Sequence, residues 1–118
     1  MIQLYGLLKC STCKKARDWL SSKNIEHEFI DYRDQPLSPA LLTQYAKSLG
    51  GWEKLVNRAS MTWRQLSEEQ REASTDKQWQ DLIAQYPALV RRPLTILDDG
   101  TVMTGFSEKK FQQHQDLK

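Results

Sequence analysis

The chain has 118 residues, of which 39% are hydrophobic and 27% charged, with a formal net charge of +2. This length and hydrophobicity suit one compact domain, and the weak net charge gives no argument for direct nucleic-acid binding. No apolar run approaches the roughly 20 residues that span a bilayer and no basic, apolar leader opens the chain, so we expect a cytoplasmic protein that does not enter membranes.

The first third of the chain predicts a β-α-β unit. A short, mainly apolar run at 2–5 and alternating apolar and polar residues at 25–32 indicate two strands. Between them, residues 11–23 repeat apolar side chains at a helical spacing, and Asn24 is expected to end this helix. A right-handed crossover makes the two strands parallel.

The middle of the chain is predicted to be helical. Ser38 and Pro39 begin one helix with an N-cap residue and a first-turn proline. Residues 51–87 follow as a predicted helical insertion, in which two pairs of residues have the spacing of a capping box. These pairs are Ser67 with Gln70 and Thr75 with Gln78.

The last third predicts a hairpin and a final helix. Two β-rich runs within residues 91–106 flank Asp99-Gly100, a strong signal for a tight antiparallel turn. Ser107 then caps a helix over residues 107–117. This order of elements predicts a single α/β domain of thioredoxin-like fold over residues 1–118, with a mixed four-stranded sheet and a helical insertion.

A Cys-x-x-Cys motif, Cys10 to Cys13, lies where the first strand passes into the first helix. The unpaired N–H groups and the dipole of a helix start favour a thiolate, so we expect Cys10 to be more acidic than a free cysteine. Lys9 and Lys14 add positive charge nearby. Cys13 lies one turn further on the same face, where it can resolve a mixed disulfide formed on Cys10.

Two other interpretations fit the motif less well. Both cysteines could be inert core thiols, but a strand-loop-helix context is the one in which this motif is redox-active. A zinc site needs four ligands, and the two histidines, His27 and His114, fall outside any finger spacing. The sequence therefore favours a thiol redox site without a metal or bound cofactor.

Three segments carry a family resemblance: "YGLLKCSTCKKARDWL", "LVNRASMTWRQL" and "YPALVRRPLTILDDGTVMTGFSEKKF". Together they resemble the arsenate reductase-like (ArsC-like) proteins, and within them the Spx and YffB branch of the thioredoxin superfamily. The resemblance implies that Cys10 is the nucleophile and that Arg58 and Arg92 help form an anion pocket. It also implies that Pro93 follows a cis peptide bond beside the redox cysteine.

The same resemblance implies the function. Members of the YffB branch are regarded as glutathione-dependent thiol reductases, which makes glutathione or a partner thiol the expected electron source. The Spx proteins imply the alternative, a redox switch that binds RNA polymerase. The segment "NRASMTWRQL" and the compact length favour the YffB branch.

Further residues are expected to contact the substrate, and one expected contact is absent. Lys9, Thr12 and Arg91 are expected, with Pro93, to form the substrate-binding surface around Cys10.

Arsenate reductases of this fold hold the oxyanion with a third arginine followed by proline and serine, where this chain has "TGFSE". We therefore expect poor arsenate reduction.

Overall fold

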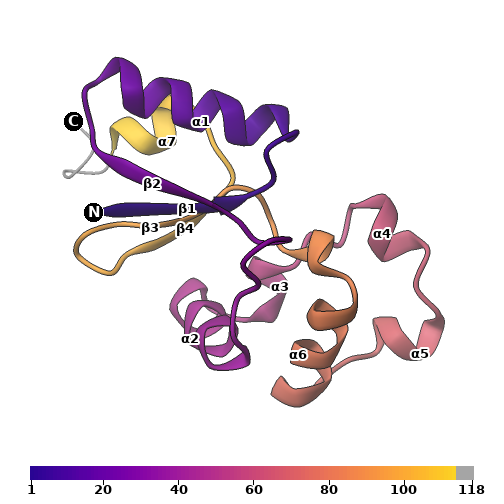
Figure 1. Cartoon of the computed structure of the whole chain (residues 1–118). Coiled ribbons are helices and arrows are strands. Elements are labelled where there is room, and N and C mark those ends of the chain that lie inside the picture. Colours follow the sequence, from indigo (N-terminus) through magenta and orange to yellow (C-terminus); the bar gives the residue numbers. More distant parts are fainter. Residues whose placement is uncertain (114–118) are drawn as a thin grey trace. The chain divides into compact units, whose positions relative to one another are not determined.

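The computed structural model describes residues 1–113. The chain is divided into two compact units, one made of Met1–Gln35 with the chain from Arg92 onward, the other of Pro36–Arg91 (Figure 1). No helix within the described residues is long and apolar enough to cross a membrane. His114 and the predicted helical residues after it lie outside the described part.

The described part of the first unit contains a four-stranded sheet with the strand order β2-β1-β3-β4. Strands β1 (Ile2–Gly6) and β2 (His27–Asp31) are parallel and are joined by helix α1 (Ser11–Ser22). Strand β3 (Leu94–Ile96) is antiparallel to β1 and to β4 (Val102–Thr104). The predicted β-α-β unit, the hairpin and the mixed sheet are thereby confirmed.

Local sequence explains where these elements begin and end. After α1, Asn24 takes the left-handed conformation with φ 57°, as expected of a residue that stops a helix. Gly100, with φ 90°, supplies the positive φ that the hairpin turn requires. The Ser107 hydroxyl accepts the N–H of Lys110 at 3.1 Å and so caps helix α7 (Glu108–Gln112).

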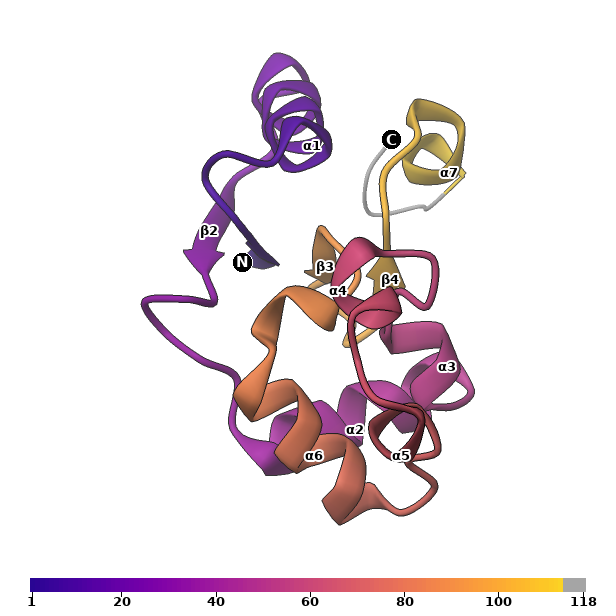
Figure 2. The ribbon, with the colours of Figure 1, turned by 90° about the vertical axis from the view of Figure 1, so that its right-hand side faces the viewer.

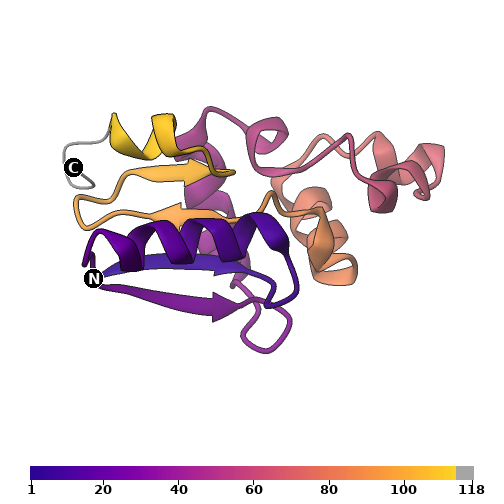
Figure 3. The ribbon, with the colours of Figure 1, turned by 90° about the horizontal axis from the view of Figure 1, so that it is seen from above.

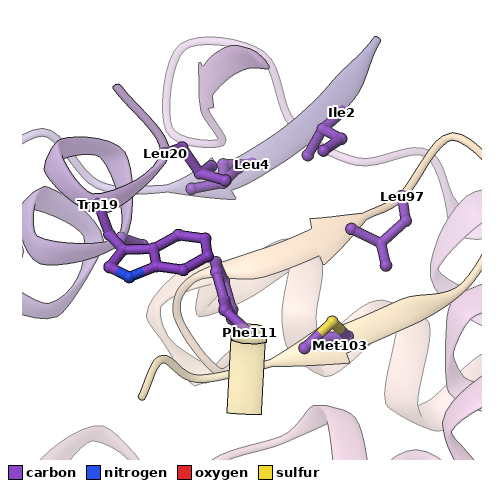
Figure 4. Packing of buried hydrophobic residues seen from close by; sticks show 8 residues of the cluster. Ile2, Leu4, Trp19, Leu20, Leu97, Met103 and Phe111 are labelled. Atoms are coloured by element: carbon purple, nitrogen blue, oxygen red, sulfur yellow. The ribbon is translucent and has the colours of Figure 1, made fainter. Parts of the chain in front are cut away.

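The core of the first unit lies between the sheet and two helices. Helices α1 and α7 cover the same face of the sheet (Figures 2 and 3). Trp19 from α1 meets Phe111 from α7 edge to face, with ring centroids 5.6 Å apart. Fully burying a large apolar side chain contributes roughly 1.5–3 kcal/mol, so this cluster holds the helices on the sheet. Its members are Ile2, Leu4, Ala16, Trp19, Leu20, Leu97, Met103 and Phe111 (Figure 4).

The second unit is helical, as the sequence predicted. Two capping boxes are present, in which Ser67 and Thr75 accept the N–H groups of Gln70 and Gln78. Ser38 caps the first helix of the unit by accepting the N–H of Leu41. Its elements are α2 (Pro39–Leu49), α3 (Trp52–Leu55), α4 (Met61–Arg64), α5 (Glu68–Arg71), α6 (Asp76–Gln85) and the 3-10 helix η1 (Pro87–Leu89).

Candidate active site

Cys10 is the N-cap residue of α1 and has an extended backbone, with φ −79° and ψ 120°. Its N–H donates to the carbonyl of Leu7 at 3.1 Å, which closes the turn between β1 and α1. The N–H groups of Thr12 and Cys13 lie within hydrogen-bonding reach of the Cys10 sulfur, although the side chain completes no regular cap. The thiol is free and partly exposed, so a substrate can reach it.

The surroundings of Cys10 lower its pKa. Burial is the largest single influence and acts in the opposite direction, because a less hydrated site disfavours the charged thiolate. The N–H and thiol of Cys13, the N–H of Thr12 and the positive charge of Arg92 together outweigh burial. Cys10 is therefore prepared to react as a thiolate.

Cys13 differs from Cys10 in that its thiol is buried and its pKa is raised. It is 0% exposed, and burial raises its pKa to about 11, with the neighbouring Cys10 also disfavouring ionisation. The N–H of Leu7 donates to its sulfur and partly opposes this rise. Gly6 leaves the space for that sulfur, since a Cβ at Gly6 would lie only 2.5 Å from Cys13 Sγ. Cys13 therefore remains protonated near neutral pH and donates its hydrogen to Cys10.

Tyr32 is a buried partner of Arg92 that the sequence analysis missed. It is 2% exposed, and its backbone N–H donates to the Gly6 carbonyl at 3.1 Å. Burial raises the pKa of Tyr32 to about 12, although the charge of Arg92 and a hydrogen bond from its guanidinium act the other way. The phenol therefore stays protonated at neutral pH and holds the guanidinium that also influences both cysteines.

The structure confirms the predicted cis peptide bond between Arg92 and Pro93. Pro93 is buried, and its carbonyl accepts the N–H of Gly105 at 2.9 Å. This bond ties the segment before β3 to the segment after β4. Arg92 is thus carried by backbone that the hairpin holds in place.

The two predicted lysines differ from Arg92 in their surroundings. Lys9 is exposed. The Lys14 ammonium lies 2.7 Å from the Asp18 carboxylate one turn along α1, and both side chains are largely exposed. The positive charge of Lys14 is thereby offset by a carboxylate, whereas the charge of Arg92 is among the main influences on the pKa of Cys10.

Two predicted arginines, Arg58 and Arg91, belong to the second unit, whose boundary falls between Arg91 and Arg92. The guanidinium carbon of Arg58 lies 5.5 Å from the centroid of the Trp63 ring. Trp63 in turn stacks on Trp79, with centroids 5.9 Å apart. The Arg91 backbone N–H donates to the Leu55 carbonyl at 2.8 Å. Arg58 therefore stands at the end of an aromatic stack, and its predicted role in an anion pocket stays a prediction.

The sequence analysis did not single out Gly6, Asp31 and Tyr32, which all lie at the ends of β1 and β2. Asp31 and Tyr32 come at the end of β2, and Gly6 ends β1, where it pairs with Asp31. The ends of parallel strands meet at one edge of a sheet, which is where ligands commonly bind in α/β folds. That rule, applied to the predicted β-α-β unit, could have drawn attention to all three residues.

The two thiols should separate in an alkylation experiment over pH. Only the thiolate reacts, and an unperturbed cysteine has a pKa near 8.5. Cys10 should therefore show its midpoint below about 8.5, whereas Cys13 should become reactive only near its pKa of about 11. Peptide mapping after iodoacetamide treatment gives each rate separately. A Cys10 midpoint at or above the ordinary value would contradict the thiolate argument.

Comparisons with known proteins agree on one family. The ArsC family matches residues 5–114. An uncharacterized protein of Haemophilus influenzae is 43% identical over 112 residues, covering 95% of this chain and 96% of its own. The global transcriptional regulator Spx of Streptococcus agalactiae is 32% identical, covering 95% of this chain and 81% of its own. The solved structure of a protein called YFFB superposes with a TM-score of 0.86 at 29% identity, covering 95% of this chain and 96% of that one.

Proposed function

This chain belongs to the ArsC family, and we propose that it is a thiol–disulfide reductase that works with glutathione. The observation that supports this most is the state of Cys10. It combines partial exposure with a pKa lowered by its hydrogen bonds and by Arg92. Thiolates of this kind attack disulfides.

In the first proposed step, the Cys10 thiolate attacks the glutathione sulfur of a mixed disulfide, R–S–S–G. A bond forms between Cys10 and glutathione, the old S–S bond breaks, and R–S⁻ leaves and takes a proton. Cys10 then carries no charge. Because that charge helps to raise the pKa of Cys13, its loss favours deprotonation of the second thiol.

In the second step, Cys13 attacks the adduct, releases glutathione and forms a Cys10–Cys13 disulfide. Two further glutathione thiols reduce this disulfide and leave as glutathione disulfide. The alternative is direct attack on the adduct by one glutathione thiolate, which also yields glutathione disulfide and the Cys10 thiolate. Either route converts R–S–S–G and one net glutathione into R–SH and glutathione disulfide.

The other site residues take the roles that the resemblance implies. Arg92 stabilises the thiolate and, with its forked donors, can bind a carboxylate of glutathione. We propose Arg58 as a second anion-binding arginine. Lys9, Thr12, Arg91 and Pro93 complete the proposed substrate-binding set.

The assay that tests this function compares two substrates, a glutathione mixed disulfide and arsenate. We expect turnover of the mixed disulfide with glutathione, coupled to glutathione reductase, and little or no arsenate turnover.

At the position of the third arginine, Gly105 has φ 75°, which suits glycine better than arginine. Phe106 instead packs on Phe111, with ring centroids 4.8 Å apart.

The size of the arsenate effect follows from the lost contacts. Each charge-assisted hydrogen bond to a desolvated anion is worth on the order of 1.5–3 kcal/mol, and about 1.4 kcal/mol is already tenfold in affinity. Arsenate affinity should therefore be at least about tenfold weaker than with the third arginine. Efficient arsenate turnover at micromolar substrate would overturn this part of the proposal, and no turnover of the mixed disulfide would overturn the reductase itself.

A regulator is the second candidate, because Spx, a global transcriptional regulator, is 32% identical over nearly this whole chain. In that case the cysteine pair would act as a redox switch on a protein that binds RNA polymerase. The two candidates separate when the purified protein is tested for polymerase retention beside the reductase assay. Retained polymerase without turnover would favour the regulator.

A further inference from the structure

The turn that carries Cys10 is held mainly through its backbone. The side chains of Leu8 and Lys9 are exposed, with Leu8 58% exposed, so burial does not hold the middle of the turn. Cys10 N–H donates to the Leu7 carbonyl at 3.1 Å, and Leu7 N–H donates to the Cys13 sulfur. Near the tip, the N–H of Leu8 is a further backbone donor of this turn.

That donor is bound by Asp31. Its Oδ2 accepts the Leu8 N–H at 3.2 Å, while Oδ1 accepts the N–H of Arg33 at 2.9 Å. The Arg33 side chain adds a longer ion pair of 4.0 Å, and the Asp31 side chain is 10% exposed. One carboxylate thus connects the end of β2 with the turn before α1. These hydrogen bonds, that from Arg33 foremost, hold the pKa of Asp31 below its usual range, so it is ionised at neutral pH.

We propose that Asp31 is a positioning residue for the nucleophile, because its bond to Leu8 holds the turn in the geometry that presents Cys10 to the first N–H groups of α1. The proposal rests on Cys10 being the nucleophile of the proposed function. The carboxylate acts through the backbone and not through its charge, since a negative charge beside Cys10 would disfavour the thiolate. Loss of the hydrogen bond to Leu8 should therefore raise the pKa of Cys10, whereas loss of the negative charge alone should lower it.

Two substitutions separate the two effects. Asp31→Asn removes the charge but keeps an oxygen that can accept the Leu8 N–H, whereas Asp31→Ala removes both. We expect the Cys10 alkylation midpoint to rise by at least about half a pH unit in Asp31→Ala, a threefold smaller thiolate fraction well below the midpoint. In Asp31→Asn the midpoint should stay near the wild-type value. Asp34→Asn, which removes an exposed carboxylate nearby, is the matched control and should change nothing.

Amide hydrogen exchange at Leu8, measured by NMR on the same samples, reports whether the bond is lost. Every variant with faster Leu8 exchange should show the raised midpoint. Should the alanine variant not fold, Asp31→Glu gives the comparison, because it keeps the charge and displaces the carboxylate by one methylene. Fast Leu8 exchange with an unchanged midpoint, or an equal fall of the midpoint in the asparagine and alanine variants, overturns the proposal. Neither measurement involves turnover, so failure of the reductase assay leaves this test intact.

Discussion

Replacing Cys10 by serine should abolish reduction of a glutathione mixed disulfide. The hydroxyl of serine does not ionise near neutral pH, so the stabilising surroundings of residue 10 have no thiolate to act on. Those surroundings are the hydrogen bonds from Thr12 and Cys13 and the charge of Arg92. Loss of the nucleophile removes the first bond-forming step. Cys13 does not replace it, because its thiol is buried and burial is the main cause of its raised pKa.

The matched variant is Cys13→Ser, which keeps a hydrogen-bond donor beside Cys10. The first attack should proceed, and a Cys10–glutathione adduct should accumulate if Cys13 is the resolving thiol. Mass spectrometry of the intact protein after incubation with the mixed disulfide detects that adduct. Comparable residual turnover in the two serine variants would show that their roles are assigned wrongly. Full turnover in Cys13→Ser would instead select direct resolution by glutathione.

Replacing Gly6 by alanine should destabilise the protein by about 1–3 kcal/mol, the usual cost of an added methyl group in a packed site. The new Cβ would lie 2.5 Å from Cys13 Sγ and 3.4 Å from Phe29 Cε2, so the sulfur must move. Because the thiol of Cys13 donates to Cys10, that movement should also raise the pKa of Cys10. Urea unfolding and the Cys10 alkylation midpoint measure the two effects.

A double-mutant cycle assigns this cost to one contact. In a Cys13→Ala background the sulfur is absent, so the further change Gly6→Ala should cost much less than it does in the wild-type chain. A second control is Gly50→Ala: a Cβ there meets nothing within 4 Å, but φ is 102°, so its cost reports backbone strain alone. An undiminished cost of Gly6→Ala without the sulfur would refute the contact as its cause.

Several elements were predictable because their signals are local. The Ser67 and Thr75 capping boxes depend on a side chain and a backbone N–H three residues apart, and both formed as expected. The turn at Gly100 depends on a positive φ within the hairpin. The placement of Cys10 at a helix start likewise followed from the order of strand, loop and helix. Such signals lie within one element or between neighbours along the chain, and they need no long-range contact.

The sequence by itself therefore determined the β-α-β unit, the hairpin, the helical character of the middle of the chain and the place of the Cys-x-x-Cys motif. Through family resemblance it also determined the cis bond before Pro93. Only the tertiary structure decided which residues surround the thiols: the phenol of Tyr32 against Arg92, and the Asp31 carboxylate on the turn before Cys10. These contacts join residues distant in the chain, because parallel pairing of β1 and β2 places their ends side by side. A hydrogen bond forms only within about 3 Å, and a residue pattern carries no information on such distances between separate elements.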